Sequence, residues 1–135
     1  MARASKNGHG SFATVFNCMD GRAVLPVIQW AKAKLAVQFV DAITAPGMDL
    51  KLAGGANGEA EEYQRCARIS IEKHGSRHVL VVGHCDCAGN PVSREEHEQH
   101  VKNAVATVRS WGLSAHVSIH GLVLDERWRP VEVLV

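Results

Sequence analysis

The sequence has little of what nucleic-acid-binding and membrane proteins need. Its 135 residues carry a net charge of only +1, and aromatic residues make up 5% of the chain. The basic surplus that attracts nucleic acid or an anionic membrane is therefore missing, as are the aromatic side chains of a base-stacking surface. No apolar run approaches the roughly 18 residues of a membrane span. The glycine-rich motifs of nucleotide-binding proteins do not occur either.

The remaining composition is typical of a folded domain. With 46% hydrophobic and 21% charged residues, the chain does not fall in the disordered class. At roughly 150 residues per domain, we expect one domain over residues 11–135, preceded by a flexible arm at residues 1–10. The arm is polar and lacks the apolar region of a secretory signal, so we expect a cytoplasmic protein. Four cysteines in such a protein favour metal ligands, catalytic thiols or small buried side chains over disulfides.

Strand and helix patterns alternate along the chain. The expected strands are 12–18, 37–43, 79–83, 116–124 and 129–135, and the expected helices are 24–35, 59–73 and 93–111. A turn at 125–127 joins the last two strands in a hairpin. This order predicts an α/β fold of three layers, α/β/α. Its sheet has four or five strands, mostly parallel, with an antiparallel C-terminal edge strand.

The sequence predicts further details of two helices and of one connecting segment. Pro26 suits the first turn of the first helix, whose predicted buried stripe is Val24, Leu25, Ile28, Ala31 and Leu35. Residues 44–57 contain proline and repeated glycine, and we expect a long loop there. Ser93 and Glu96 have the spacing of a capping box at the start of the last helix. Its predicted buried stripe is Val101, Ala104, Val105 and Val108.

Two clusters of chemically active residues lie where predicted strands end. The first is the segment Cys-Met-Asp-Gly-Arg at 18–22, and the second is His-Cys-Asp-Cys at 84–87. Ligands of open parallel sheets bind outside the carboxyl ends of the strands. If the two strands are neighbours, the two clusters meet at this edge.

Cys18, His84 and Cys87 form a set that suits zinc. Zinc favours thiolate and imidazole ligands, and a catalytic zinc has three protein ligands and one open position for water. Two thiolates and one neutral imidazole leave the ion formally neutral. We therefore expect such a zinc to lower the pKa of its water less than a zinc held by three imidazoles does. Asp20 can accept a hydrogen bond from this water, and Arg22 can hold Asp20 ionised through a bidentate pair.

These motifs resemble those of the β-class carbonic anhydrases. The likeness lies in Cys-x-Asp-x-Arg at one strand end and His-x-x-Cys at the next buried strand, and it extends over most of residues 12–135. The resemblance implies reversible zinc-dependent hydration of carbon dioxide to bicarbonate, with Cys18, His84 and Cys87 on zinc and Asp20–Arg22 as the catalytic dyad. It also implies a homodimer or higher oligomer. The segment after Cys87 has room for one helix only, so the chain resembles a short, divergent member.

Other interpretations of the site remain open. Relatives with the same fold hydrolyse carbon disulfide or carbonyl sulfide, which changes the substrate and keeps the site. A non-catalytic protein would close the zinc with a fourth ligand, either Cys85 or Asp20. If Cys85 is not a ligand, we expect it to face the core as a small apolar side chain.

Four further residues have less specific signals. We expect Cys66 in the core and Asp86 in a turn or on the surface. His97 and His100 are spaced i and i+3 on the helix that follows the capping box. We expect them on its solvated face, with a proton relay as the alternative role.

Overall fold

Five strands form one sheet in the order β2-β1-β3-β4-β5. The computed structural model describes residues 10–54 and 57–135, so the predicted arm lies outside the described residues except for Gly10. The strands are β1 (Phe12–Cys18), β2 (Phe39–Ala45), β3 (His78–His84), β4 (Ser118–Leu124) and β5 (Pro130–Val133). The first four are parallel, and β5 pairs with β4 in the antiparallel direction. The predicted sheet is confirmed, including its antiparallel C-terminal edge.

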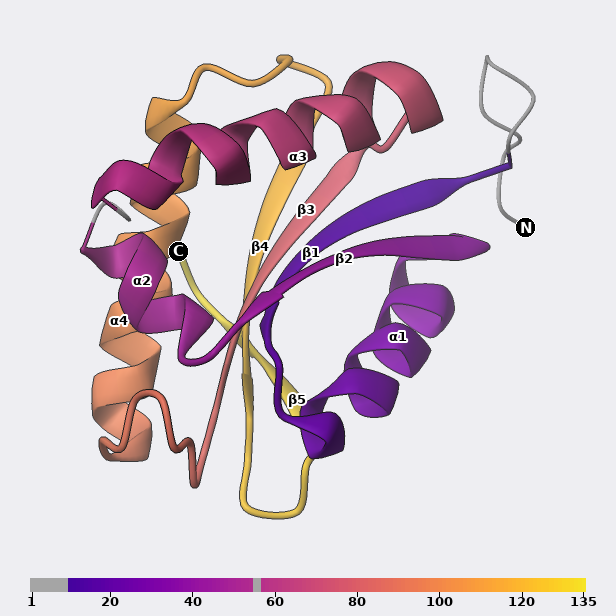
Figure 1. The fold of residues 1–135 in the computed structure, drawn as a ribbon. Coiled ribbons are helices and arrows are strands. Elements are labelled where there is room, and N and C mark those ends of the chain that lie inside the picture. Colours follow the sequence, from indigo (N-terminus) through magenta and orange to yellow (C-terminus); the bar gives the residue numbers. More distant parts are fainter. Residues whose placement is uncertain (1–9, 55–56) are drawn as a thin grey trace.

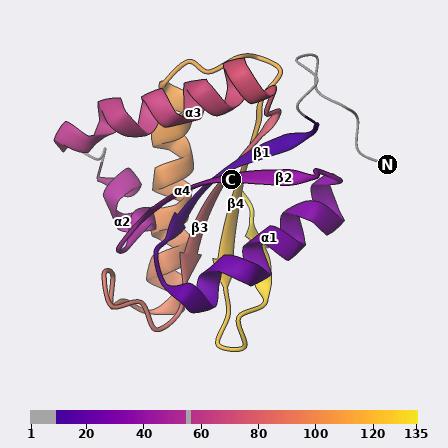
Figure 2. The same cartoon turned by 45° about the vertical axis from the view of Figure 1, so that its right-hand side comes forward.

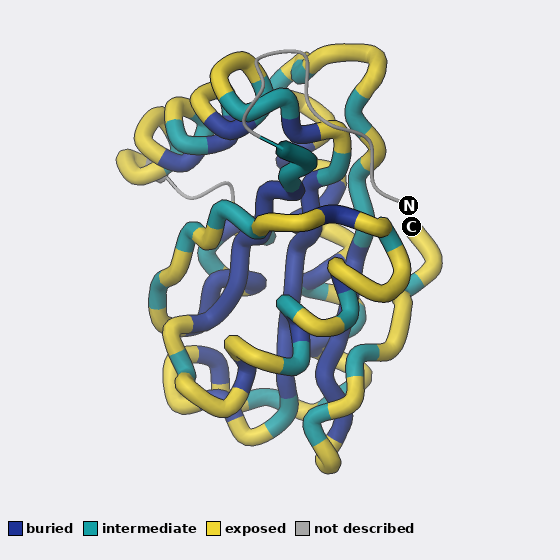
Figure 3. The backbone as a smooth tube through the Cα atoms, turned by 90° about the vertical axis from the view of Figure 1, so that its right-hand side faces the viewer, coloured by how far each residue is buried: buried dark blue, intermediate teal, exposed yellow. Residues whose placement is uncertain are grey.

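Helices cover both faces of the sheet, which confirms the three-layer arrangement (Figures 1 and 2). One face carries α1 (Gly21–Leu35). The opposite face carries α2 (Met48–Ala53), α3 (Ala60–His74) and α4 (Arg94–Ser110), with a short 3-10 turn η1 at Asn57–Glu59. The three central strands β1, β3 and β4 run through the middle as a mostly buried layer (Figure 3). In the parts of the chain that the structure describes, no helix has the length and apolar character to cross a membrane.

The core is split into two parts by the sheet, because alternate side chains of a strand point to opposite faces. On the α1 side, Val15, Leu80 and Leu122 pack with Ala23 and Val27. On the other side, the strand residues Phe16, Val81 and Val123 pack with side chains of α2, α3 and α4. Burial of both faces explains why β3 is an uninterrupted apolar run up to Gly83.

The predicted buried face of α1 is only partly confirmed, since Ala31 is buried and Leu35 packs against the core, but Val24 and Leu25 do not face it. Ala23, Val27 and Ala31 are buried, whereas Val24 and Leu25 are exposed, and Pro26 lies inside the helix beyond its first turn. The helix begins already at Gly21, because the Asp20 side chain accepts a hydrogen bond from the Arg22 amide and caps it. Ala23, Val27 and Ala31, spaced four apart, then face the sheet.

The long loop predicted at 44–57 is also wrong, because α2 lies within it. β2 continues to Ala45, a Pro46–Gly47 turn follows, and Met48 begins the helix. Met48 and Leu52 are one turn apart and fully buried, so burial of this short apolar face stabilises α2 in the fold. By contrast, the predicted capping box at Ser93 and the four-residue buried stripe of α4 are both confirmed.

Candidate metal centre

The two clusters meet because β1 and β3 are neighbouring parallel strands. Cys18 is the last residue of β1 and His84 the last residue of β3. Cys87 follows a turn in which Asp86 adopts a left-handed backbone, with φ 54°. The three side chains are buried, and their ligand atoms all lie within 4.8 Å of one another. The turn therefore brings Cys87 to the same side as His84, where a straight strand would separate them.

The geometry of the three residues fits a tetrahedral metal such as zinc. The two sulfur atoms, Cys18 Sγ and Cys87 Sγ, are 3.9 Å apart. Zinc–sulfur bonds of about 2.3 Å in tetrahedral geometry place two sulfurs about 3.8 Å apart. Burial and the neighbouring Cys18 thiol raise the pKa of Cys87, so metal binding at neutral pH must displace the proton of this thiol.

The His84 imidazole is prepared for a ligand at one nitrogen. Its Nδ1 lies 2.7 Å from the Cys85 carbonyl oxygen. Since a carbonyl only accepts, Nδ1 carries the hydrogen and Nε2 has a free electron pair. His84 Nε2 is fully buried and has no hydrogen-bond partner among the described residues. Metal-binding histidines typically donate their other N–H to such an outer partner, so the site fits a metal at Nε2.

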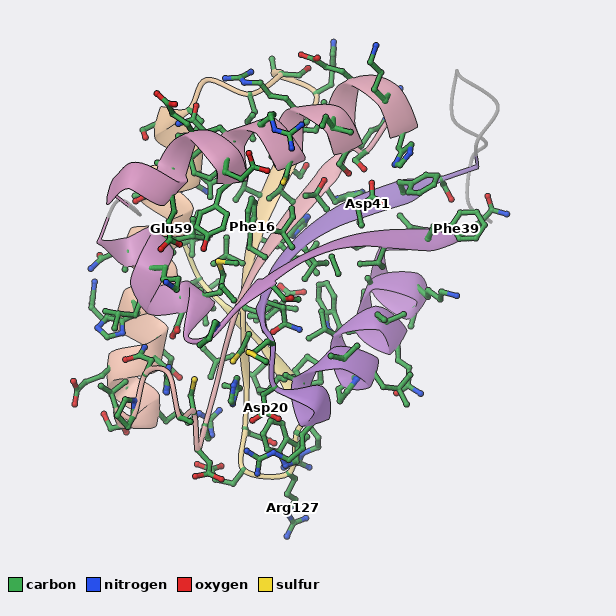
Figure 4. All side chains as sticks on the ribbon, in the orientation of Figure 1. Phe16, Asp20, Phe39, Asp41, Glu59 and Arg127 are labelled. Carbon is green, nitrogen blue, oxygen red and sulfur yellow. The ribbon has the colours of Figure 1, made fainter. Side chains whose placement is uncertain are left out.

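Asp20 and Arg22 form a bidentate pair beside this cluster. Arg22 donates from Nε to Asp20 Oδ1 at 3.1 Å and from its terminal nitrogen to Oδ2 at 2.7 Å. These bonds and the Arg22 backbone amide lower the pKa of Asp20 to about 2. Asp20 lies just beyond the carboxyl end of β1, at the start of α1 (Figure 4). Its oxygens do not belong to the group of converging ligand atoms found in the described residues.

Trp128 is a site residue that the sequence analysis missed. The Arg22 guanidinium lies 4.4 Å from the centre of the Trp128 ring, and the His84 ring lies 5.3 Å from it. Arg22 also donates to Asp86 at 3.1 Å, so it bridges the first cluster, the second cluster and the β4–β5 hairpin. A lone tryptophan next to a predicted turn gives no sequence signal for this role.

The β4–β5 turn is held by the buried carboxylate of Asp125. Its oxygens accept hydrogen bonds from the backbone amides of Arg127 and Arg129 and from Arg129 Nε. The two backbone amides are among the groups that lower its pKa. This network sets the left-handed backbone of Trp128, with φ 61°, and directs its ring toward the site, whereas Arg127 points away at the tip (Figure 4).

The other residues singled out in the sequence lie outside the ligand cluster, and three of them differ from their predicted positions. Cys85 is only partly buried, 3.7 Å from Glu126, and does not join the ligand cluster, so its predicted core position is wrong. Cys66 is likewise partly buried, 3.8 Å from Glu62, rather than in the core. Asp86 is exposed in a turn, as predicted. His97 is fully buried and not on a solvated face, because Asp49 of α2 provides a partner for it.

Backbone packing fixes the turn that follows Cys87. A Cβ atom placed on Gly89 would lie 2.6 Å from the Gly47 amide nitrogen and 2.7 Å from the Pro46 carbonyl carbon. Only glycine allows the two backbone segments to approach this closely.

We therefore expect Gly89→Ala to destabilise the protein by about 1–3 kcal/mol, the usual cost of overpacking a rigid contact. Urea denaturation would measure the loss. Gly21→Ala is the matched control, since a Cβ there meets nothing within 4 Å. Equal stability of the two variants would contradict this account of the turn.

Comparison with known proteins identifies first the fold and then the family. A carbonic anhydrase from Glaciozyma antarctica superposes with a TM-score of 0.60 at 19% identity, covering 91% of this chain and 81% of that one. A tetrameric β-carbonic anhydrase from Sordaria macrospora gives a TM-score of 0.52 at 13% identity, covering 95% and 83%. The fold is thus that of the β-carbonic anhydrases.

The family assignment comes from the sequence of nearly the whole domain. Residues 8–134 match the family described as "Putative carbonic anhydrase". The chain belongs to this carbonic anhydrase family, which agrees with the resemblance drawn from the two motifs. No curated protein matches the chain significantly.

Proposed function

We propose that this protein is a zinc enzyme that reversibly hydrates carbon dioxide to bicarbonate. The observation that carries the proposal is the convergence of Cys18, His84 and Cys87, with a buried free electron pair on His84 Nε2. This convergence lies beside the ionised Asp20–Arg22 pair, at the carboxyl edge of a carbonic anhydrase fold. Three converging ligands leave a position for water, as a catalytic zinc requires.

Each residue has a distinct role in this proposal. Cys18, His84 and Cys87 would hold zinc, which when bound would supply a nucleophilic water near neutral pH. Asp20 would accept a hydrogen bond from the attacking water and orient it toward carbon dioxide. Arg22 keeps Asp20 ionised and oriented. The Trp128 ring holds the Arg22 guanidinium from the hairpin side.

The arrangement also supports an open site over a closed one. Both Asp20 oxygens are bound by Arg22, and Cys85 lies against Glu126 rather than in the cluster. Either residue would have to move to become a fourth ligand. We further propose a homodimer or higher oligomer, since one structural neighbour is tetrameric. We also propose that the protein is cytoplasmic and that residues 11–135 form a single domain.

Stopped-flow measurement of carbon dioxide hydration by zinc-loaded protein, at neutral and alkaline pH, tests the function. Turnover at both pH values is the expected result. Turnover at alkaline pH alone would indicate that Asp20 caps the metal at lower pH. No turnover at either pH with zinc bound would overturn the proposal. Assays with carbonyl sulfide and carbon disulfide, together with metal-edge spectroscopy, would then separate a different substrate from a four-ligand closed site.

A further inference from the structure

A buried Asp–His pair lies beneath the candidate metal centre and has no part in the function proposed above. Asp49 Oδ2 and His97 Nδ1 are 2.7 Å apart, and the two side chains are 2% and 0% exposed. Burying such polar groups is costly unless they are bonded to one another. The pair joins α2 to α4, two elements that are distant in the sequence.

The pair contacts both ends of the segment that supplies two of the proposed ligands. We call residues 84–90 the metal loop, since it contains His84 and Cys87. At its start, a Cβ on Gly83 would lie 2.7 Å from Asp49 Oδ2, so the carboxylate rests directly against the end of β3. At its end, Asn90 is buried and donates to Asp49 Oδ1 at 3.1 Å.

Two further contacts complete this arrangement. Asn90 also donates to His100 Nδ1 at 2.9 Å, which ties the end of the metal loop to α4 a second time. The His97 ring lies nearly parallel to the His84 ring, at 13°, with centroids 6.5 Å apart. His97 Nε2 has no hydrogen-bond partner among the described residues, so Asp49 alone fixes this ring by hydrogen bonding.

We propose that Asp49 and His97 are positioning residues for the metal centre, holding both ends of the metal loop so that His84 and Cys87 converge with Cys18. The carboxylate is the central element, because its two oxygens bind the loop end and α4 at once. Its contact with Gly83 prevents the start of the loop from shifting toward α2. This inference rests on the proposed metal site and adds the residues that shape it.

Since His97 bonds Asp49 through Nδ1, two substitutions of His97 can be compared, one that keeps a donor at this position and one that does not. Asparagine places its amide nitrogen where His97 Nδ1 lies and can still donate to Asp49, whereas glutamine places its amide nitrogen near the position of Nε2. Both are uncharged amides that remove the ring. Zinc affinity is measured by competition with a chelator, and the absorption spectrum of the cobalt-substituted protein reports ligand geometry.

We expect His97→Gln to weaken zinc binding by up to the roughly 10–100-fold that direct outer partners of metal ligands contribute, and to alter the cobalt spectrum, because the loop that carries two ligands loses its fixed position. His97→Asn should stay within a few-fold of the original protein. Val108→Ala, at the far end of α4, should lower thermal stability and leave zinc affinity unchanged. Equal affinities for the glutamine and asparagine variants would overturn the inference. Failure of the unmodified protein to bind zinc would instead overturn the proposed function and, with it, this inference.

Discussion

Replacing Cys18 by serine should remove zinc and abolish carbon dioxide hydration. We expect more than about a 100-fold loss of zinc affinity, because changes to outer partners alone cost 10–100-fold. Zinc retains little attraction for a neutral hydroxyl where it had a thiolate. The substitution is nearly isosteric, so the buried end of β1 should remain folded. Zinc content after dialysis and the rate of carbon dioxide hydration are the two measurements.

The metal loop offers a matched control, a second cysteine-to-serine substitution at Cys85. Cys85 lies between His84 and Cys87, yet its sulfur is directed to Glu126 and does not belong to the ligand cluster. Cys85→Ser should therefore retain both zinc and turnover. If zinc stays bound in Cys18→Ser and in His84→Ala, the proposed ligand set is wrong.

Asp20→Asn should keep zinc and lose activity by about 10²–10³-fold. Groups that orient or take a proton in the transition state typically contribute factors of this size. Asparagine is as good a helix cap as aspartate, so α1 should still begin at Gly21. The substitution removes the charge that pairs with Arg22 and one of the two acceptor oxygens. The rate of hydration and the zinc content separate this effect from metal loss.

The pH dependence follows from the direction of the Asp20 shift. Its pKa is lowered to about 2, so the carboxylate stays ionised throughout the neutral and alkaline range. Its pairing with Arg22 stabilises the fold above the unfolded pKa of about 4, and this stabilisation is lost only as the pH falls toward 2. The defect of Asp20→Asn should hence be constant from neutral to alkaline pH. Asp86→Asn, at an exposed partner of Arg22, is the control, and an equal loss there would argue against a special role of Asp20.

The sequence predicted the sheet well because its signals are local. β1 was predicted with its observed bounds, and the apolar run before His84 indicated a strand buried on both faces. Parallel strands end at one edge, so residues of the two motifs could be expected together provided that their strands are neighbours, as β1 and β3 are. The candidate metal cluster is made of those strand ends and one turn.

The failures have a common cause in long-range packing. The face of α1 depends on how the helix docks on the sheet, which buries Val27 and leaves Val24 and Leu25 exposed. α2 is too short to be stable alone and forms because Met48 and Leu52 are buried by distant elements. His97 was expected in solvent as a polar residue of a capped helix, and its partner, Asp49, lies in the segment predicted to be a loop. A buried polar residue can be predicted only when its partner is known.

The tight contact between Gly47 and Gly89 has a consequence for how this protein can vary. Since the metal loop is anchored by backbone at Gly89 and by Asp49 at both ends, its length is fixed and an insertion there would separate the ligands. The side chains of Cys85, Asp86 and Ala88, by contrast, are not fully buried. Cys85 and Ala88 can accept other side chains while the anchors stay in place, whereas the left-handed backbone of Asp86 limits what can replace it. Divergent members, and designed ones, can thus change these side chains without rebuilding the centre of the site.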